Sequence, residues 1–461
     1  MKYLSRKSGR NSNIDMTNGP VTGPLILYML PLLGSGILQQ LYNTVDFIFI
    51  GNLLDKTAAA AVGASSSLIY CTTGLFLGIS VGTSVVMSHA FGAGDTEKAD
   101  RALHTSAAFA IIGGSVLSVV TIVFSPQILR ILNTPENVIP AAVVYMRIYM
   151  LSVPASVLYN MFSGAVRATG DSAAPFRILA ACGVANVALD ALFLIVIPLG
   201  VAGVAWATLI SQLLSAVLIA HVLRRRDGVL YLRPSSISID LPVLKNILRI
   251  GIPAGIQTLL ITFSNIIVQY YVNGLGEVSV AAFATYYKLE NLIYLPLLAF
   301  GQCSTVFAGQ NTGAQQYSRI RKGSNRLLLL CIAVTVAVTV TILLMPETVF
   351  GWFMNDPEVV ECAVSIAMIT FPFYWLYSFI EVYGGSVRGM GYSITSMLIT
   401  ISNICILRII LLAVFSSKSA SLGKIASVYP LTWGGAAVCF AAAFILILHK
   451  KLSAHRPRLC Q

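Results

Sequence analysis

Twelve long apolar stretches, separated by short polar or Pro/Gly breaks, constrain this chain more than any other feature of its sequence. An α-helix needs about 20 apolar residues to cross a bilayer, and irregular backbone cannot face lipid. The stretches therefore predict an all-α integral membrane protein with twelve transmembrane helices. We expect these helices at residues 24–52, 58–90, 102–125, 138–166, 175–196, 201–223, 246–272, 279–308, 325–346, 360–386, 395–416 and 424–449.

Charged residues are scarce and confined to particular places. Only 10% of the 461 residues are charged, against about 25% in ordinary soluble proteins, which excludes a soluble enzyme. The formal net charge is +12, but the basic residues fall in short segments between the apolar runs. They therefore set the topology in the lipid bilayer, and no nucleic-acid partner is expected.

The basic residues also distinguish the two sides of the membrane. Twenty-three Lys and Arg fall in the N-terminal segment, the tail and every second loop, whereas the other side holds only Lys56, Arg130, Lys418 and Lys424. Because cytoplasmic loops carry the excess of Lys and Arg, both termini are predicted to be cytoplasmic, in a multi-pass plasma (inner) membrane protein. The first 20 residues are basic and polar and precede no cleavage signal, so we expect them to be retained.

Short motifs recur at a fixed separation along the chain. GAVRATGDS at 164–172 returns as GSVRGMGYS at 385–393, and Gly92-Ala93 returns as Gly313-Ala314, both 221 residues later. Each repeat has an even number of crossings, so the two six-helix lobes are predicted to be related by a pseudo-two-fold axis along the membrane normal. Two such lobes can rock about a central cavity and open it alternately to each face of the membrane. The alternative is a duplication that serves stability alone. The predicted units are a cytoplasmic N-terminal segment (1–23), an N-lobe (24–223), a cytoplasmic interlobe linker (224–245), a C-lobe (246–449) and a cytoplasmic tail (450–461).

Two acids in the first half stand within apolar helices. Asp46 and Asp190 lie in the expected helices 1 and 5, where a carboxylate costs at least a few kcal/mol and is a functional candidate by default. Tyr42 lies one turn before Asp46, Asn186 lies at i−4 to Asp190, and the nearby helix 6 offers the Thr208 hydroxyl. Such oxygens suit a proton or a hard monovalent cation. The alternative for Asp190 is a polar group that ties helices together.

The second half has weaker candidates of the same kind. Glu381 has Tyr377 at i−4, and Glu290 is expected near the aqueous rim or paired with another helix, so both are secondary cavity candidates together with Tyr42 and Tyr377. Arg147 and Arg408 also lie in apolar runs, where they neutralise acids or reach a surface. Pro31 is a candidate hinge in helix 1, with a static kink as the alternative.

Several chemistries have no sequence support. The chain has no phosphate-binding loop, no HExxH or GxSxG motif and no clustered Cys or His. We therefore expect no enzyme activity, no cofactor, and no metal beyond Na+ as one of two coupling ions. The five histidines fall near predicted cytoplasmic helix ends, where solvated surface positions are expected.

With these residues in hand, the chain resembles the multidrug and toxic compound extrusion (MATE) transporters over residues 20–450. The resemblance rests on Pro31 with Asp46, FGAG at 91–94, RATGDSAAP at 167–175, NVALD at 186–190, GVAGVAWAT at 200–208 and RGMGYS at 388–393. It implies secondary active export of xenobiotic, often cationic, organic compounds in exchange for H+ or Na+ through alternating access. We expect a monomer.

The resemblance is strongest to the DinF-like branch of that family. Asp46, Asn186, Asp190 and Thr208 match its first-lobe cation site position by position. In the NorM-like branch the site lies in the second lobe, and here Tyr377 and Glu381 match but helix 7 has no acid. Coupling through the first lobe is therefore expected. A lipid-linked oligosaccharide flippase of the same superfamily is the alternative, although the acids in helices 1 and 5 do not suit a polyanionic lipid.

Overall fold

The computed structural model describes residues 14–226, 230–416 and 421–455, and all regular secondary structure in these ranges is helical. Lys418, the first 13 residues and the end of the predicted tail lie outside the described residues. The elements are α1 (Thr22–Leu53), α2 (Lys56–Ala93), α3 (Thr96–Ile131), α4 (Ile139–Leu151), α5 (Val153–Ala168), α6 (Ala173–Ala191), η1 (Leu192–Val196), α7 (Val201–Arg224), η2 (Pro234–Ser236), α8 (Leu241–Asn273), α9 (Glu277–Gly313), α10 (Tyr317–Leu344), α11 (Pro346–Gly351), α12 (Pro357–Thr370), η3 (Phe371–Leu376), α13 (Tyr377–Gly389), α14 (Ser393–Thr400), η4 (Ile401–Leu407), α15 (Arg408–Ser416) and α16 (Leu422–His455).

The predicted twelve crossings are present in the described part of the chain. Eleven helices are long and apolar enough to cross a membrane, and the bent pair α4 and α5 makes the twelfth. Large apolar side chains on their outer faces are exposed, such as Val116, Val119 and Val123 of α3 at 58%, 60% and 56%. Such a stripe is unfavourable in water and suits contact with lipid.

Four of the predicted spans are not regular α-helices. The fourth bends by 40° between α4 and α5, where Pro154 lies in the first turn of α5 and has no backbone N–H to donate. The tenth contains the 3₁₀ segment η3, which includes Pro372, and the fifth and eleventh contain the π-helical segments η1 and η4. By contrast, α1 is assigned as one continuous helix through Pro31.

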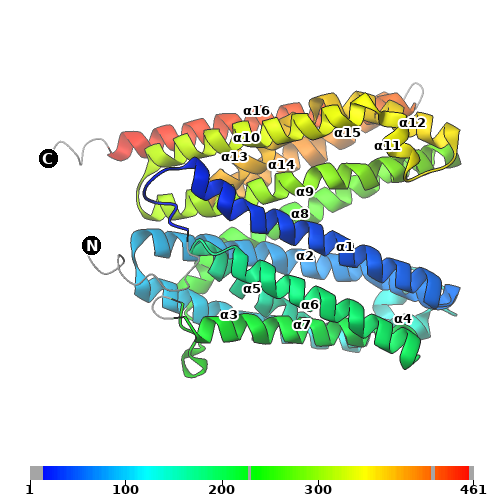
Figure 1. Cartoon of the computed structure of the whole chain (residues 1–461), viewed down its shortest axis with the longest axis horizontal. Coiled ribbons are helices and arrows are strands. Elements are labelled where there is room, and N and C mark those ends of the chain that lie inside the picture. Colours follow the sequence, from blue (N-terminus) through cyan, green and yellow to red (C-terminus); the bar gives the residue numbers. More distant parts are fainter. Residues whose placement is uncertain (1–13, 227–229, 417–420, 456–461) are drawn as a thin grey trace.

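The helices form two bundles, with α1 running obliquely between them (Figure 1). One buried core gathers residues of α2 to α7 with the beginning of α8, and the other gathers residues of α9 to α16 with the end of α8. The beginning of α1 packs into the second core through Leu25, Tyr28 and Leu32, although α1 belongs to the first lobe in sequence. Farther along, α1 packs against α6 of the first lobe. This one helix therefore contacts both lobes.

The two lobes meet through contacts that repeat at the sequence offset of 221. His89 Nε2 donates to the Gly389 carbonyl at 2.7 Å, and Gln310 Nε2 donates to the Ala168 carbonyl at 2.7 Å. Residue 310 is the repeat partner of 89, and 389 is the repeat partner of 168. The predicted pseudo-two-fold relation is thus confirmed by a reciprocal pair of bonds. His89 was expected to be a solvated surface residue; that expectation is wrong, because its ring is bonded across the lobe interface.

Glycine allows the backbones to approach at this interface. A Cβ added to Gly92 would lie 1.9 Å from the Gln310 carbonyl oxygen, and one added to Gly313 would lie 2.1 Å from the His89 carbonyl oxygen. Nearer mid-helix, a Cβ on Gly78 would lie 2.2 Å from Gly255 Cα. Gly78 and Gly82 of α2 face Gly251 and Gly255 of α8, so each helix offers the small-xxx-small pattern that lets membrane helices pack closely.

We expect Gly78→Ala to weaken the contact between the lobes, because the backbone of Gly255 cannot yield to the new methyl group. Overpacking of this kind costs about 1–3 kcal/mol, which should lower the melting temperature of the detergent-purified protein by several degrees. Gly74→Ala is the control, since its Cβ would meet Thr258 at an ordinary 3.8 Å and both variants gain similar helix propensity. Equal melting temperatures for the two variants would contradict the assigned seam.

Candidate functional site

The predicted first-lobe acids lie on two helices that pack together. Asp46 is partly buried on α1, and Asp190 is 1% exposed in the last turn of α6. The two carboxylates interact electrostatically across the seam between α1 and α6. Asp46 Oδ1 and both oxygens of Asp190 are buried and have no hydrogen-bond donor among the described residues. Buried carboxylates without donors are costly unless a proton or a cation neutralises them.

The other two predicted ligands lie on α6 and α7. Asn186 is buried one turn before Asp190, and its Nδ2 has no hydrogen-bond partner among the described residues. Thr208 lies on α7, and its hydroxyl donates to the Val204 carbonyl of its own helix at 3.1 Å. Its remaining lone pairs are still acceptors. The oxygens of Asn186 and Thr208 are therefore available as ligands.

Tyr42 lies at the same α1–α6 seam. Its ring packs on Gly183 of α6 so closely that a Cβ added to Gly183 would lie 2.7 Å from Tyr42 Cδ1. Its phenol interacts electrostatically with Asp46. The glycine thus lets an aromatic ring on α1 approach the backbone of α6 one turn from the acid.

Sequence reasoning missed two tyrosines that complete this site. Tyr145 and Tyr149 of α4 lie with their ring centroids 5.9 Å apart, and both interact electrostatically with Asp46. Tyr145 also interacts with Asp190. Their i, i+4 spacing within an apolar run was the available signal, because it places two phenols on one helix face.

The π-helical segment η1 begins two residues after Asp190. Such segments are rare and occur mostly as local insertions in α-helices, frequently at functional sites. A π turn rotates the residues that follow relative to those before it. The side chains beyond η1 therefore point in other directions than a continuous α-helix through Asn186 and Asp190 would give them.

The second-lobe acids both have a protein donor. Tyr374 donates to Glu290 Oε1 at 3.3 Å, and Tyr294 donates to Glu381 Oε1 at 3.2 Å. Glu290 is thus paired with another helix, one of the two settings expected for it. Glu381 approaches α9 where Gly301 has no side chain, since an added Cβ would lie 2.4 Å from Glu381 Oε2.

An aromatic cluster joins these two acids. Tyr377 contacts Tyr294 edge-on at a centroid distance of 5.5 Å and stacks with Tyr374 at 5.9 Å. Trp433 of α16 contacts both Tyr374 and Tyr377, at 5.0 and 5.8 Å. The predicted Tyr377 therefore lies between Glu290 and Glu381 in a chain of rings.

Arg147 and Arg408, the two arginines in apolar runs, bind no carboxylate within 4 Å among the described residues. Arg147 Nε donates to the Ile122 carbonyl and to Ser125 Oγ, at 3.2 and 3.1 Å. Arg408 Nη1 donates to Asn265 Oδ1 at 3.0 Å, and its guanidinium lies 4.7 Å from the centroid of Tyr429. Arg408 is only 3% exposed, and it acts on Glu290 electrostatically without forming a close ion pair.

The predicted helix 7 corresponds to α8, and its Gln257 makes hydrogen bonds that join helices. Gln257 is buried and donates to Thr400 Oγ1 at 3.0 Å, while its carbonyl accepts from Ser396 at 3.4 Å. Ser396 in turn accepts from Arg388 at 3.3 Å. A neutral amide thus links α8 to α14 at a position where an acid would supply charge.

Comparisons with known proteins agree with this architecture. The chain is 28% identical over 430 residues to the probable multidrug resistance protein YoeA of Bacillus subtilis, with 91% of each chain covered. It is 23% identical over 354 residues to the multidrug export protein MepA of Staphylococcus aureus, covering 76% of this chain and 78% of that protein.

Solved structures show the same fold. A MATE crystal structure in complex with MaL6 superposes with a TM-score of 0.89 at 21% identity, covering 96% of this chain and 100% of that one. An outward-facing multidrug resistance MATE family transporter of the MOP superfamily gives 0.86 at 22% identity, covering 97% and 100%.

The family model MatE matches twice, at residues 31–192 and 253–414, so that each lobe carries one copy. The two matches begin 222 residues apart, close to the offset of the repeated motifs and of the reciprocal interlobe bonds. Together they cover more than half of the chain. The chain therefore belongs to the MatE family of membrane transporters.

Proposed function

We propose that this transporter exports small organic compounds by alternating access, and that inward movement of H+ or Na+ through the first lobe drives the export. The observation that carries the proposal is the pair Asp46 and Asp190, two carboxylates that face each other inside the membrane with no donor on three of their four oxygens. The names of the multidrug resistance and export relatives support the substrate class.

Cation binding at this pair would change the force between α1 and α6. With both acids ionised, two like charges in a low-dielectric setting repel; a proton or Na+ between them removes the repulsion. Each charge that enters through a potential of about 100 mV supplies about 2.3 kcal/mol, before any concentration gradient. That energy is available to displace α1.

The position of α1 would carry this change to the other lobe. Its first turns pack into the C-lobe core through Leu25 and Tyr28, whereas Asp46 lies at the N-lobe seam. Pro31 lies between these two attachments and removes one backbone hydrogen bond from the helix. We therefore assign Pro31 the role of a hinge that lets the outer part of α1 move while its inner part stays in the C-lobe.

The second lobe holds an aromatic cluster whose chemistry suits cationic aromatic compounds. Tyr374 and Trp433, each 1% exposed, lie with Tyr377 near Glu290 and Glu381. Once the lobe opens and exposes them, these rings would attract organic cations by cation–π interaction. The balance of two acids against the buried Arg408 does not suit a polyanionic lipid. It favours a drug exporter over the flippase alternative.

We further propose that both termini face the cytoplasm. The start of α1, the end of α16 and the chain between α7 and α8 all lie at one end of the molecule (Figure 1). These are the segments that carry the excess of Lys and Arg.

The proposed sidedness predicts opposite labelling of two exposed sites. In a chain whose native cysteines are replaced by alanine, Ser235→Cys in the interlobe linker should resist a membrane-impermeant maleimide applied to intact cells. Glu136→Cys, between α3 and α4, should react, because that turn lies at the other end of the molecule. The reverse pattern would overturn the assigned topology.

Asp46→Asn and Asp190→Asn should each reduce gradient-driven export at least tenfold while leaving expression and melting temperature near those of the parent chain. Asparagine keeps the shape and hydrogen bonding of the acid but cannot change charge. The measurement is drug efflux from proteoliposomes with pH and Na+ gradients imposed separately, which also identifies the coupling ion. Glu290→Gln and Glu381→Gln are the matched controls and should change substrate range more than coupling. Export that survives in Asp46→Asn but is lost in Glu381→Gln would place coupling in the second lobe.

A further inference from the structure

Each lobe is preceded by a short non-membrane segment that leads into its first helix. The first, residues 14–21, leads into α1, and the second, residues 231–240, leads into α8. We call them the N-leader and the C-leader. Residues 14–19 correspond to 235–240 at the repeat offset of 221. The two leaders are therefore repeat partners, and they can be compared contact by contact.

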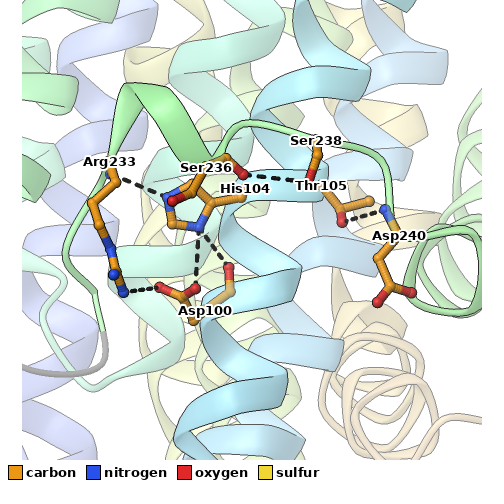
Figure 2. A network of polar contacts seen from close by, with 7 residues as sticks. All are labelled: Asp100, His104, Thr105, Arg233, Ser236, Ser238 and Asp240. Carbon is orange, nitrogen blue, oxygen red and sulfur yellow. Dashed lines mark hydrogen bonds and ion pairs between the residues drawn. The ribbon is translucent and has the colours of Figure 1, made fainter.

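The C-leader is docked on α3 of the N-lobe (Figure 2). The Arg233 backbone N–H donates to His104 Nε2 at 3.1 Å, and His104 Nδ1 donates to the Asp100 carbonyl at 2.8 Å. The Asp240 backbone N–H donates to Thr105 Oγ1 at 3.1 Å, and Arg233 pairs with Asp100 at 3.4 Å. His104 is 3% exposed, so the expectation of a solvated histidine is wrong here as well.

The N-leader is docked in the corresponding way on α10 of the C-lobe. Arg319 donates to three backbone carbonyls of the leader, those of Met16 at 3.0 Å, Asn18 at 2.9 Å and Gly19 at 2.8 Å. Asn311 Nδ2 also donates to the Met16 carbonyl, at 3.1 Å. The Met16 side chain is 1% exposed and packs in the C-lobe core. Thr105 binds the end of the C-leader, and its repeat partner Arg326 donates to Thr22 Oγ1 at the start of α1, just after the N-leader, at 3.2 Å.

The N-leader holds its own shape through Asp15. The Asp15 carboxylate accepts bonds from the Thr17 backbone and hydroxyl and from the Asn18 side chain. Burial alone would raise the pKa of this carboxyl, but these hydrogen bonds outweigh it and hold the pKa below its usual value. The carboxylate thus stays ionised at neutral pH, and the turn it organises persists.

The N-leader also contacts the N-lobe. The Ile14 backbone N–H donates to the Gly170 carbonyl at 3.2 Å, in the loop between α5 and α6. Gly170 has φ +92° and would place a Cβ 2.2 Å from the Ile14 carbonyl oxygen. Ala168, two residues earlier, receives the interlobe bond from Gln310. The leader therefore contacts both lobes, beside the place where the ends of α2 and α9 cross.

We propose that residues 14–19 are a strap that holds the two lobes together at the cytoplasmic end and that its Ile14–Gly170 attachment opens in each transport cycle. This inference rests on the proposed function, since alternating access requires the lobes to part at this end. One backbone hydrogen bond attaches the strap to the N-lobe, against four from Arg319 and Asn311 to the C-lobe. The strap therefore releases at Gly170 and stays with the C-lobe.

The chain offers a matched pair of variants for testing the strap. Gly170 and Gly391 are repeat partners with φ +92° and +91°, so alanine strains both backbones equally. Only at Gly170 does the new methyl group meet the strap; at Gly391 the nearest atom is His89 Cε1 at an ordinary 3.6 Å. Arg319→Ala removes three of the four hydrogen bonds that hold the strap on the C-lobe, and the exposed Arg321→Ala on the same helix is its control.

Strap release is read from the reactivity of Ile14→Cys, which keeps the backbone N–H that binds Gly170, in a chain that is otherwise free of cysteine, using maleimide applied to the cytoplasmic face of inside-out vesicles. Labelling should be slow at rest, at least fivefold faster with Gly170→Ala or Arg319→Ala, and near the resting rate with Gly391→Ala or Arg321→Ala. Drug and an imposed cation gradient should also accelerate it. Cleavage before Asp15 by an Asp-specific endoprotease gives the same comparison with the native Ile14 and cysteines in place.

Equal rates in the strap variants and their controls, by both measurements, would overturn the strap. Fast labelling of Ile14→Cys in the otherwise unaltered resting chain would do so too. These resting rates are independent of transport. Absent drug efflux in the parent chain therefore overturns the proposed function, while the resting comparison still decides whether the strap holds the lobes.

Discussion

The two lobes are held in register by backbone contacts that only glycine permits. Because Gly92 and Gly313 have no side chain, the ends of α2 and α9 cross so closely that a carbonyl oxygen of one helix occupies the space of a methyl group on the other. The hydrogen bonds of His89 and Gln310 form beside this crossing. In a bilayer there is little hydrophobic gain in bringing helices together, so close packing and hydrogen bonds must hold the interface. The remaining parts of the molecule, including α1 and both leaders, are positioned by this crossing.

The two repeats have diverged where they meet each other. Gly78 and Gly82 on α2 pack against glycines of α8, whereas the repeat partners of these two residues on α9 are Ala299 and Cys303, facing α1. The α2–α8 seam is therefore closed by backbone contact, and the α1–α9 seam has side chains between the helices. Helix α1, which carries Asp46 and Pro31, lies at the less tightly packed of the two seams. This asymmetry suits a molecule in which α1 moves while the two lobes pivot about the α2–α8 seam.

Much of the fold follows from the sequence because it depends on long signals. The twelve apolar runs, the offset of 221 and the small-residue motifs predict the spans and the duplication, and all are found. The breaks were not predicted: η1 and η4 arise from tertiary packing of residues with ordinary helix patterns, although Pro154 and Pro372 mark two other irregularities. For the site, Asp46 and Asp190 were predictable because a charge in an apolar run is conspicuous. The i, i+4 spacing of Tyr145 and Tyr149 places both phenols on one helix face, but their partners lie far away in sequence, so the sequence does not show that this face meets the acids.

The acids of the two lobes differ in a way that bears on coupling. In the C-lobe, Glu290 and Glu381 each accept a bond from a tyrosine, and Arg408 lies buried nearby; hydrogen-bond donors stabilise an ionised carboxylate without any mobile ion. In the N-lobe, Asp190 has no such donor, and the nearest charge is another carboxylate. This contrast is the ground on which we propose that the first lobe, whose acids the protein leaves without donors, takes a proton or cation from solution. On that proposal, a duplicated scaffold keeps two acidic lobes and couples export to ions through one of them.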